Sequence, residues 1–189
     1  MKNLVISKYR NAAQAGGKEY WQAVNELNEL KKNESQYFKP TFSKLLTEAA
    51  MKVDNAESKA KQLISQAHAE AVRVIKDKYA LSGDQINEDT IKLLKSGVKL
   101  SSAEVNELMK KAESITMQRI ISDYANEHGI NTGGKFVSEQ DALAELNALD
   151  SMARSGLQRD FYFNDVINNS DEFDKVAGEC FSGESFISE

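Results

Sequence analysis

The sequence contains little cysteine, little proline and few aromatic residues. Its 189 residues include one cysteine, Cys180, one proline, Pro40, and 8% aromatic residues. A single cysteine excludes an intramolecular disulfide bond and is compatible with a cytosolic protein. One proline and few aromatic residues are much more typical of an α-rich chain than of a β-sandwich or a β-barrel.

Long apolar runs are also missing from the sequence. No run approaches the roughly 18 apolar residues that a membrane-spanning helix needs. The N-terminal sequence MKNLVISKYRNAAQ contains an apolar stretch of only three residues. We therefore expect neither a signal peptide nor a membrane anchor, and no membrane partner. A composition with 41% apolar and 28% charged residues is typical of a soluble, folded protein.

Negative charge is concentrated near the C-terminus. Residues 160–189 contain eight Asp or Glu residues against Lys175 alone, a net charge of −7. Because the whole chain carries −5, the first 159 residues carry +2. No basic stripe runs along the chain, so we expect no direct contact with nucleic acid.

The segment 42–79 has neither glycine nor proline and shows helical spacing of its apolar residues. It predicts one long helix, about 57 Å in length at about 1.5 Å per residue. Steps of four and three residues from Phe42 give ten positions, of which only Glu70 is polar. We expect the other nine to mediate self-association: Phe42, Leu46, Ala49, Val53, Ala56, Ala60, Leu63, Ala67 and Val74. Near Glu70 the stripe drifts toward Ala71 and Ile75, which indicates the 3.6-residue period of a straight helix.

The residues before this helix predict its partner in a hairpin. Residues 2–14 predict a short helix, or alternatively a strand at the apolar residues 4–6, and Gly16-Gly17 ends either one. Residues 18–32, KEYWQAVNELNELKK, predict a second helix that packs on the first half of the long one. Thr41, directly after Pro40, is the expected N-cap of the long helix. Together these helices predict an N-terminal domain over residues 1–82.

A break at Gly83 predicts a second domain, a small helical bundle over 83–156. Three short helices are bounded there by start and stop signals. The signals are Asp89 or Thr90 before a helix to Lys95, Gly97 after it, Ser101 with Glu104 before a helix to about Glu127, His128-Gly129 after it, Ser138 with Asp141 before the third helix, and Gly156 after it. The overall fold prediction is all-α, a long coiled-coil-like hairpin followed by this bundle.

The segment 157–189 combines the acidic residues with five Phe and one Tyr. Such a segment either docks on a partner and orders there or packs on its own chain. The expected partner-binding residues are Phe161, Tyr162, Phe163 and Asp165, and we expect Val166 and Ile167 to be ordered with them. Helical periodicity is not sustained beyond about residue 170, and we expect the chain after about Cys180 to be mobile unless it is bound to a partner.

No motif for catalysis or metal binding is visible. Gly133-Gly134-Lys135 lacks the spacing of a phosphate-binding loop and is best explained as a turn. His68 and His128 are the only histidines, and neither has a second ligand at metal-binding spacing. We therefore predict no catalytic residue, no cofactor-binding residue, no cofactor and no metal ligand.

One segment does resemble a known group of proteins. In residues 89–127, the pattern L-L-x-S-G-V-K-L-S is followed by an acidic helical run and then by T-M-x-R-I-I-x-x-Y-A. This pattern resembles a segment in uncharacterised helical proteins encoded by phages and prophages of Gram-positive bacteria. The resemblance implies a virion-associated or assembly protein in the cytoplasm of an infected or lysogenic bacterium.

Two functions remain open from the sequence. The first is a non-enzymatic structural or assembly protein that forms homo-oligomers through the 42–79 helix and contacts other phage structural proteins. The second is a binding module or inhibitor of a host protein that acts through the acidic aromatic segment. An enzyme would require a site assembled from residues without a sequence signature.

Overall fold

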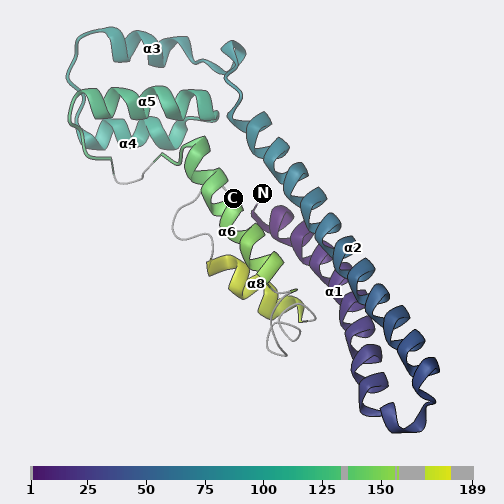
Figure 1. The fold of residues 1–189 in the computed structure, drawn as a ribbon. Coiled ribbons are helices and arrows are strands. Elements are labelled where there is room, and N and C mark those ends of the chain that lie inside the picture. Colours follow the sequence, from purple (N-terminus) through teal and green to yellow (C-terminus); the bar gives the residue numbers. More distant parts are fainter. Residues whose placement is uncertain (1, 133–135, 156, 158–168, 180–189) are drawn as a thin grey trace. The chain divides into compact units, whose positions relative to one another are not determined.

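Two long helices, α1 (Lys2–Lys32) and α2 (Lys39–Tyr79), pack against each other as an antiparallel hairpin (Figure 1). This computed structural model describes residues 2–132, 136–155, 157 and 169–179. Within these ranges the regular elements are helices and there is no strand, which confirms the predicted all-α class. The strand alternative near the N-terminus is wrong, because those residues lie in α1.

The turn of the hairpin explains where α2 begins. A short 3-10 helix, η1 (Glu34–Gln36), links the two long helices. Pro40 lies in the first turn of α2, where its missing N–H is not needed and its fixed φ suits the helix. Tyr37 and Phe42 pack their rings with centroids 6.2 Å apart, as in a hydrophobic staple. The prediction of Thr41 as N-cap is wrong, since α2 already includes Lys39.

The predicted break at Gly16-Gly17 is also wrong, because α1 runs through both glycines. Both are buried. A Cβ atom placed on Gly16 would lie 2.6 Å from both Cα and Cβ of Ala60 on α2. The missing side chain therefore allows close approach of the two helix backbones, which offsets the usual cost of glycine inside a helix.

The buried face of α2 shifts away from the heptad positions toward Ala71 and Ile75, as the sequence indicates. Ile64 and Ile75 are buried, whereas their neighbours Leu63 and Val74 are only half-buried. This face keeps the helical period of about 3.6 rather than the strict heptad of about 3.5. Its buried residues are Ala56, Ala60, Ile64, Ala67, Ala71, Ile75 and Tyr79, and the buried apolar side chains of α1 are Val5, Ile6, Tyr9, Ala13 and Ala23.

Helix α6 (Glu139–Ser155) begins where the sequence predicts. The Asp141 backbone N–H donates to the Ser138 hydroxyl at 3.1 Å, and the Ser138 N–H donates to the Asp141 carboxylate at 3.2 Å. These two bonds satisfy N–H groups that a helix start leaves without intrahelical acceptors. The predicted stop at Gly156 lies outside the described residues.

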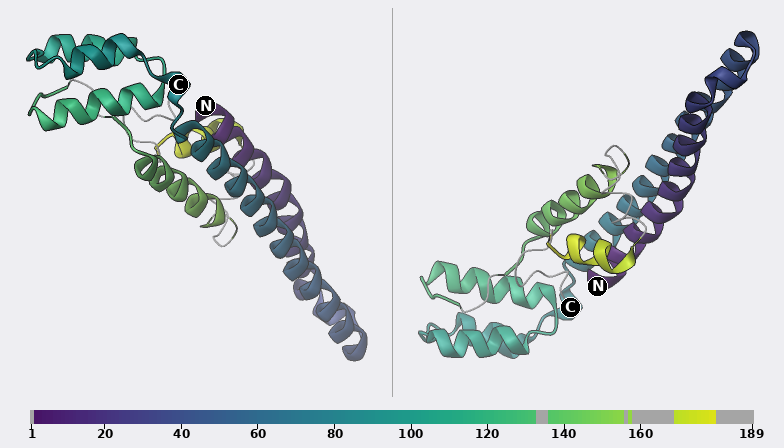
Figure 2. Two further views of the ribbon diagram at one scale, coloured as in Figure 1. Left: turned by 90° about the horizontal axis from the view of Figure 1, so that it is seen from above. Right: turned by 90° about the horizontal axis from the view of Figure 1, so that it is seen from below.

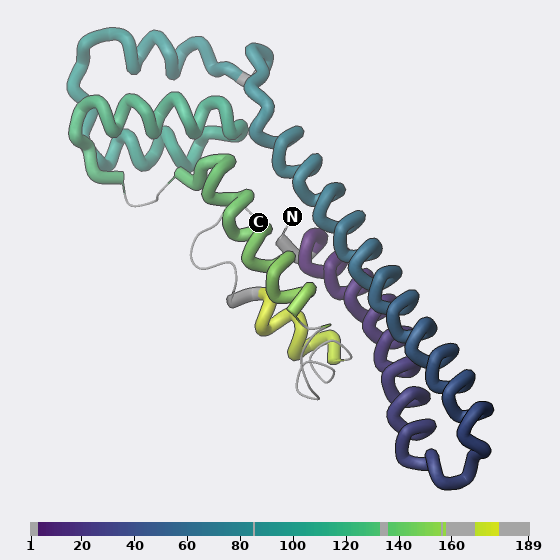
Figure 3. The backbone as a smooth tube through the Cα atoms, in the orientation of Figure 1, coloured from purple at the N-terminus to yellow at the C-terminus, as the bar shows by residue number. Residues whose placement is uncertain are grey.

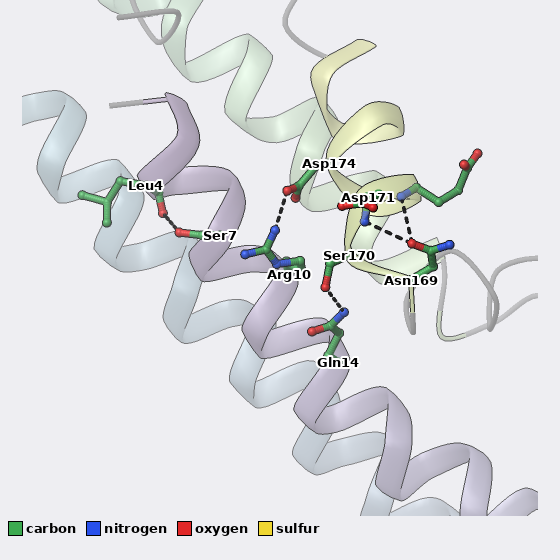
Figure 4. Close-up of polar contacts among 9 residues, drawn as sticks. Leu4, Ser7, Arg10, Gln14, Asn169, Ser170, Asp171 and Asp174 are labelled. Carbon is green, nitrogen blue, oxygen red and sulfur yellow. Dashed lines mark hydrogen bonds and ion pairs between the residues drawn. The ribbon is translucent and has the colours of Figure 1, made fainter.

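Helix α8 (Ser170–Glu179) packs on α1, which corrects the prediction that helical structure ends near residue 170 (Figure 2). Phe173 and Ala177, one helical turn apart, are fully buried. Figure 4 shows the polar contacts beside them, an ion pair of Arg10 with Asp174 and a hydrogen bond from Gln14 to the Ser170 hydroxyl at 3.3 Å.

The helices α3 (Glu88–Lys95), α4 (Ser102–Lys111) and α5 (Ile115–Glu127) belong to a second unit. The predicted single helix up to Glu127 is wrong, because Ser114 caps a new helix by accepting from the Met117 N–H at 3.1 Å. The cap of α3 is Asn87 rather than Asp89 or Thr90. The core of this unit consists of Leu100, Val105, Met117, Ile121, Tyr124 and Ala125.

Two predicted boundaries of this unit are confirmed. Ser101 and Glu104 form the capping box that begins α4. Gly129 ends α5 with a φ of 65°, and the Ile130 N–H donates to the Ala125 carbonyl at 2.8 Å. This bond is typical of a Schellman motif, in which glycine takes the left-handed conformation.

The described residues divide into two units that differ from the predicted domains. One unit draws on residues 2–72, 144–155, 157 and 169–179, and the other on residues 73–132 and 136–143. The predicted bundle over 83–156 included all of the third helix, whereas the structure groups α6 from Ala144 onward with the hairpin. The side chains of α6 that contact α1 and α2 give the physical reason.

Candidate functional site

The outer half of the hairpin is the first candidate site. We call residues 24–55 the arm; they comprise the end of α1, the turn and the start of α2 (Figure 3). The buried face of the hairpin stops at Ala23 on α1 and at Ala56 on α2, and no residue of the arm is buried. The arm is therefore a pair of helices without a core of its own.

The arm nevertheless carries many apolar side chains. Tyr37, Phe38 and Met51 are 40%, 75% and 59% exposed. Nine further apolar residues are half-buried between the two helices: Val24, Leu27, Leu30, Phe42, Leu45, Leu46, Ala49, Ala50 and Val53. Apolar surface that remains in water favours association with another apolar surface.

The structure separates the predicted self-association residues into two groups. Ala56, Ala60 and Ala67 are buried by the chain itself, so they are not available to a second copy. Phe42, Leu46, Ala49 and Val53 lie in the arm, while Leu63 and Val74 are half-buried farther along α2. Self-association through the remaining positions stays a prediction.

A partly buried polar cluster joins α1, α2 and α6 and is the second candidate site. The Tyr9 hydroxyl and His68 Nδ1 are 2.7 Å apart and share a hydrogen bond. Asp150 Oδ1 lies 3.7 Å from the same nitrogen. Arg154 donates from Nε to Asp150 Oδ2 at 2.6 Å and from a terminal nitrogen to the Ser65 hydroxyl at 3.0 Å. Each of the three helices thus contributes at least one polar partner.

The electrostatics of this cluster favour a neutral Tyr9. Its side chain is fully buried, and this burial raises the pKa of Tyr9 well above 10.0, with the nearby Asp150 carboxylate raising it further. Arg154 opposes part of this effect by its positive charge. A buried phenol that keeps its proton is a hydrogen-bonding group rather than a nucleophile. The cluster therefore connects α6 to the hairpin.

Alkaline pH should reveal the role of Tyr9. Since the folded pKa is raised above 10.0, the stabilisation is complete below that pH and falls as the pH rises above it. The free energy of unfolding of the native protein should fall more steeply than that of Tyr9→Phe, by about 1.4 kcal/mol per pH unit. Urea unfolding of both proteins between pH 8 and pH 11 measures this. Parallel pH profiles would contradict the assignment.

This cluster could not be predicted from a local sequence pattern. Tyr9 and His68 are 59 positions apart and Ser65 and Arg154 are 89 positions apart, so no local motif contains them. The available signals were a tyrosine within the apolar face of α1 and the i,i+4 spacing of Asp150 and Arg154.

The predicted partner-binding residues Phe161, Tyr162, Phe163 and Asp165 lie outside the described residues, as do Val166, Ile167 and Cys180. Part of the same acidic aromatic segment is described, and there Phe173 is buried in the chain's own core. His128 is the C-cap of α5, and its Nδ1 lies 2.9 Å from the Tyr124 carbonyl oxygen.

Comparison with known proteins gives a single result. No family model, curated protein or solved structure matches this chain. Across the described ranges, no group of three or more His, Cys, Asp or Glu side chains is placed to hold a metal ion. None of the described helices combines the length and apolar character needed to cross a bilayer.

Proposed function

We propose that the protein is a non-enzymatic structural or assembly protein that associates with further copies of itself through its long helix α2. The observation that carries this proposal is the arm, in which twelve apolar side chains are exposed or half-buried and none is buried. In a hairpin of two helices, each helix packs against only one other helix. In a four-helix bundle each helix packs against two others, so more of its apolar surface is removed from water.

The arm offers a small face. Its helical segments are residues 24–32 of α1 and 39–55 of α2, which extend about 14 Å and about 25 Å at about 1.5 Å per residue. Two helices side by side, each about 10 Å across, give a face about 20 Å wide. A face of about 500 Å² is smaller than the roughly 800 Å² per partner of a standard protein interface, so association through the arm alone should be weak.

The biological setting is a separate part of the proposal. Residues 89–127 resemble segments of helical phage and prophage proteins, and this resemblance is the support for a role in virion assembly in a bacterial cytoplasm. A self-associating helical arm is consistent with that role. The alternative function, inhibition of a host protein through the acidic aromatic segment, has less support because Phe173 packs within its own chain.

Substitution of exposed arm residues should weaken self-association. Phe38→Lys and Met51→Lys each replace an exposed apolar side chain and should raise the dissociation constant about tenfold. Leu81→Lys is the matched control, since Leu81 is 63% exposed and lies outside the arm. Sedimentation equilibrium over a concentration series measures the mass. A constant mass of 21.0 kDa for the native chain at all concentrations would overturn the proposal.

A further inference from the structure

The charged residues of the arm form two blocks of opposite sign. We call residues 31–44 the tip and residues 24–30 with 45–55 the root. The tip has a net charge of +3, from Lys31, Lys32, Lys39 and Lys44 against Glu34. The root has a net charge of −3, from Glu26, Glu29, Glu48 and Asp54 against Lys52. All ten side chains are exposed.

The two blocks follow each other along the arm and meet at their boundary, where Lys32 pairs with Glu29 at 2.7 Å and Lys44 with Glu48 at 3.9 Å. Because α1 and α2 are antiparallel, the residues before and after the tip lie beside each other in the root (Figure 3). The ion pair of Lys52 with Glu26 at 3.4 Å, across the two helices, confirms this pairing. The arm is thus electrically neutral as a whole, although the chain carries −5, and it is polarised from tip to root.

We propose that the partner of the arm is the arm of a second copy, bound antiparallel so that the tip of each lies over the root of the other. This inference rests on the proposed self-association and adds its orientation. An antiparallel pair has two-fold symmetry, so the same contact between +3 and −3 occurs twice. A parallel pair would place +3 against +3 and −3 against −3.

Charge selects the orientation, and the apolar side chains supply the affinity. Packed helices lie about 8–10 Å apart, which is within the Debye length of about 10 Å at 0.1 M salt. Facing blocks of charge therefore influence each other at moderate ionic strength. Complementary charges at an interface contribute more to orientation and encounter rate than to binding strength.

Charge reversal provides the test. The first variant reverses the tip with Lys31→Glu, Lys39→Glu and Lys44→Glu, and the second reverses the root with Glu29→Lys, Glu48→Lys and Asp54→Lys. Either variant alone gives both blocks the same sign, so the dissociation constant should rise at least about tenfold at 50 mM salt. The sixfold variant restores opposite signs and should return to within about threefold of the native value. Circular dichroism checks that each variant remains helical.

The possible outcomes separate the orientation from the proposed function. At 1 M salt, where the Debye length is about 3 Å, the differences between variants should vanish. A native dimer that is insensitive to all three sets of reversals would overturn the antiparallel orientation and leave self-association standing. A native chain that is monomeric would overturn the proposed function itself.

Cross-linking gives an independent measurement of the orientation. In a Cys180→Ser background, Ser35→Cys marks the tip and Asn55→Cys marks the root; both positions are exposed. The antiparallel pair predicts that a mixture of these two variants forms a disulfide between unlike copies. Disulfide dimers of Ser35→Cys with itself, at equal or higher yield, would overturn the proposal.

Discussion

Gly16→Ala should destabilise the hairpin, although glycine to alanine in a helix is ordinarily favourable by about 1 kcal/mol. The added methyl group would lie 2.6 Å from both Cα and Cβ of Ala60, so the two helices would have to separate. Overpacking of this kind costs about 1–3 kcal/mol. We expect the free energy of unfolding in urea to fall by about 2 kcal/mol.

Gly83→Ala is the matched control for this experiment. A Cβ atom on Gly83 has nothing within 4 Å, so the substitution should leave stability nearly unchanged. Gly16→Ser should behave like Gly16→Ala, because the clash involves the Cβ atom and not the rest of the side chain. A stabilised Gly16→Ala protein would show that the backbones of α1 and α2 do not approach as closely as this.

Gly16 also shows where sequence-based prediction fails. The conformational cost of glycine is local and visible in the sequence, and it predicted a break in α1. Its benefit depends on Ala60, which is far away in the chain and becomes a neighbour only after the hairpin has formed. A local sequence pattern therefore shows the conformational cost of Gly16 but not the gain from close packing against Ala60.

Helix ends show the opposite case. The capping box of Ser101 with Glu104 and the left-handed Gly129 were predicted correctly, because each involves residues within five positions of one another. The long helix α2 was predictable for a similar reason, since its apolar period repeats over many turns. Asn87 was missed as a cap because Asp89 and Thr90, two other good capping residues, follow two and three positions later.

The two candidate sites differ in how much the sequence reveals. The apolar residues of the arm on α2 were visible in the sequence as part of the apolar stripe of residues 42–79. The stripe does not indicate which of its residues the other helices of the chain leave exposed. That depends on α6 and α8, which belong to the same unit as the inner half of the hairpin. The cluster around Tyr9 was invisible, because its members come from three helices and have no shared period.

Phe173→Ala should release α8 from the hairpin. Phe173 is 1% exposed, and loss of a buried phenylalanine side chain costs about 3–5 kcal/mol. Helix α8 has ten residues, fewer than the roughly 12–15 that an isolated helix needs to be even marginally stable in water. It should therefore unfold when it no longer packs on α1, while the hairpin remains folded.

Amide hydrogen exchange distinguishes this local effect from global unfolding. In Phe173→Ala, the amides of residues 173–179 should lose most of their protection, whereas those around Ile64 and Ile75 should keep theirs. Lys175→Ala is the control, since Lys175 is exposed on the same helix and alanine favours helix formation. If the amides of α8 kept their protection in Phe173→Ala, the ion pair of Arg10 with Asp174 would have to hold the helix. That outcome is not expected from an ion pair that is partly exposed to solvent.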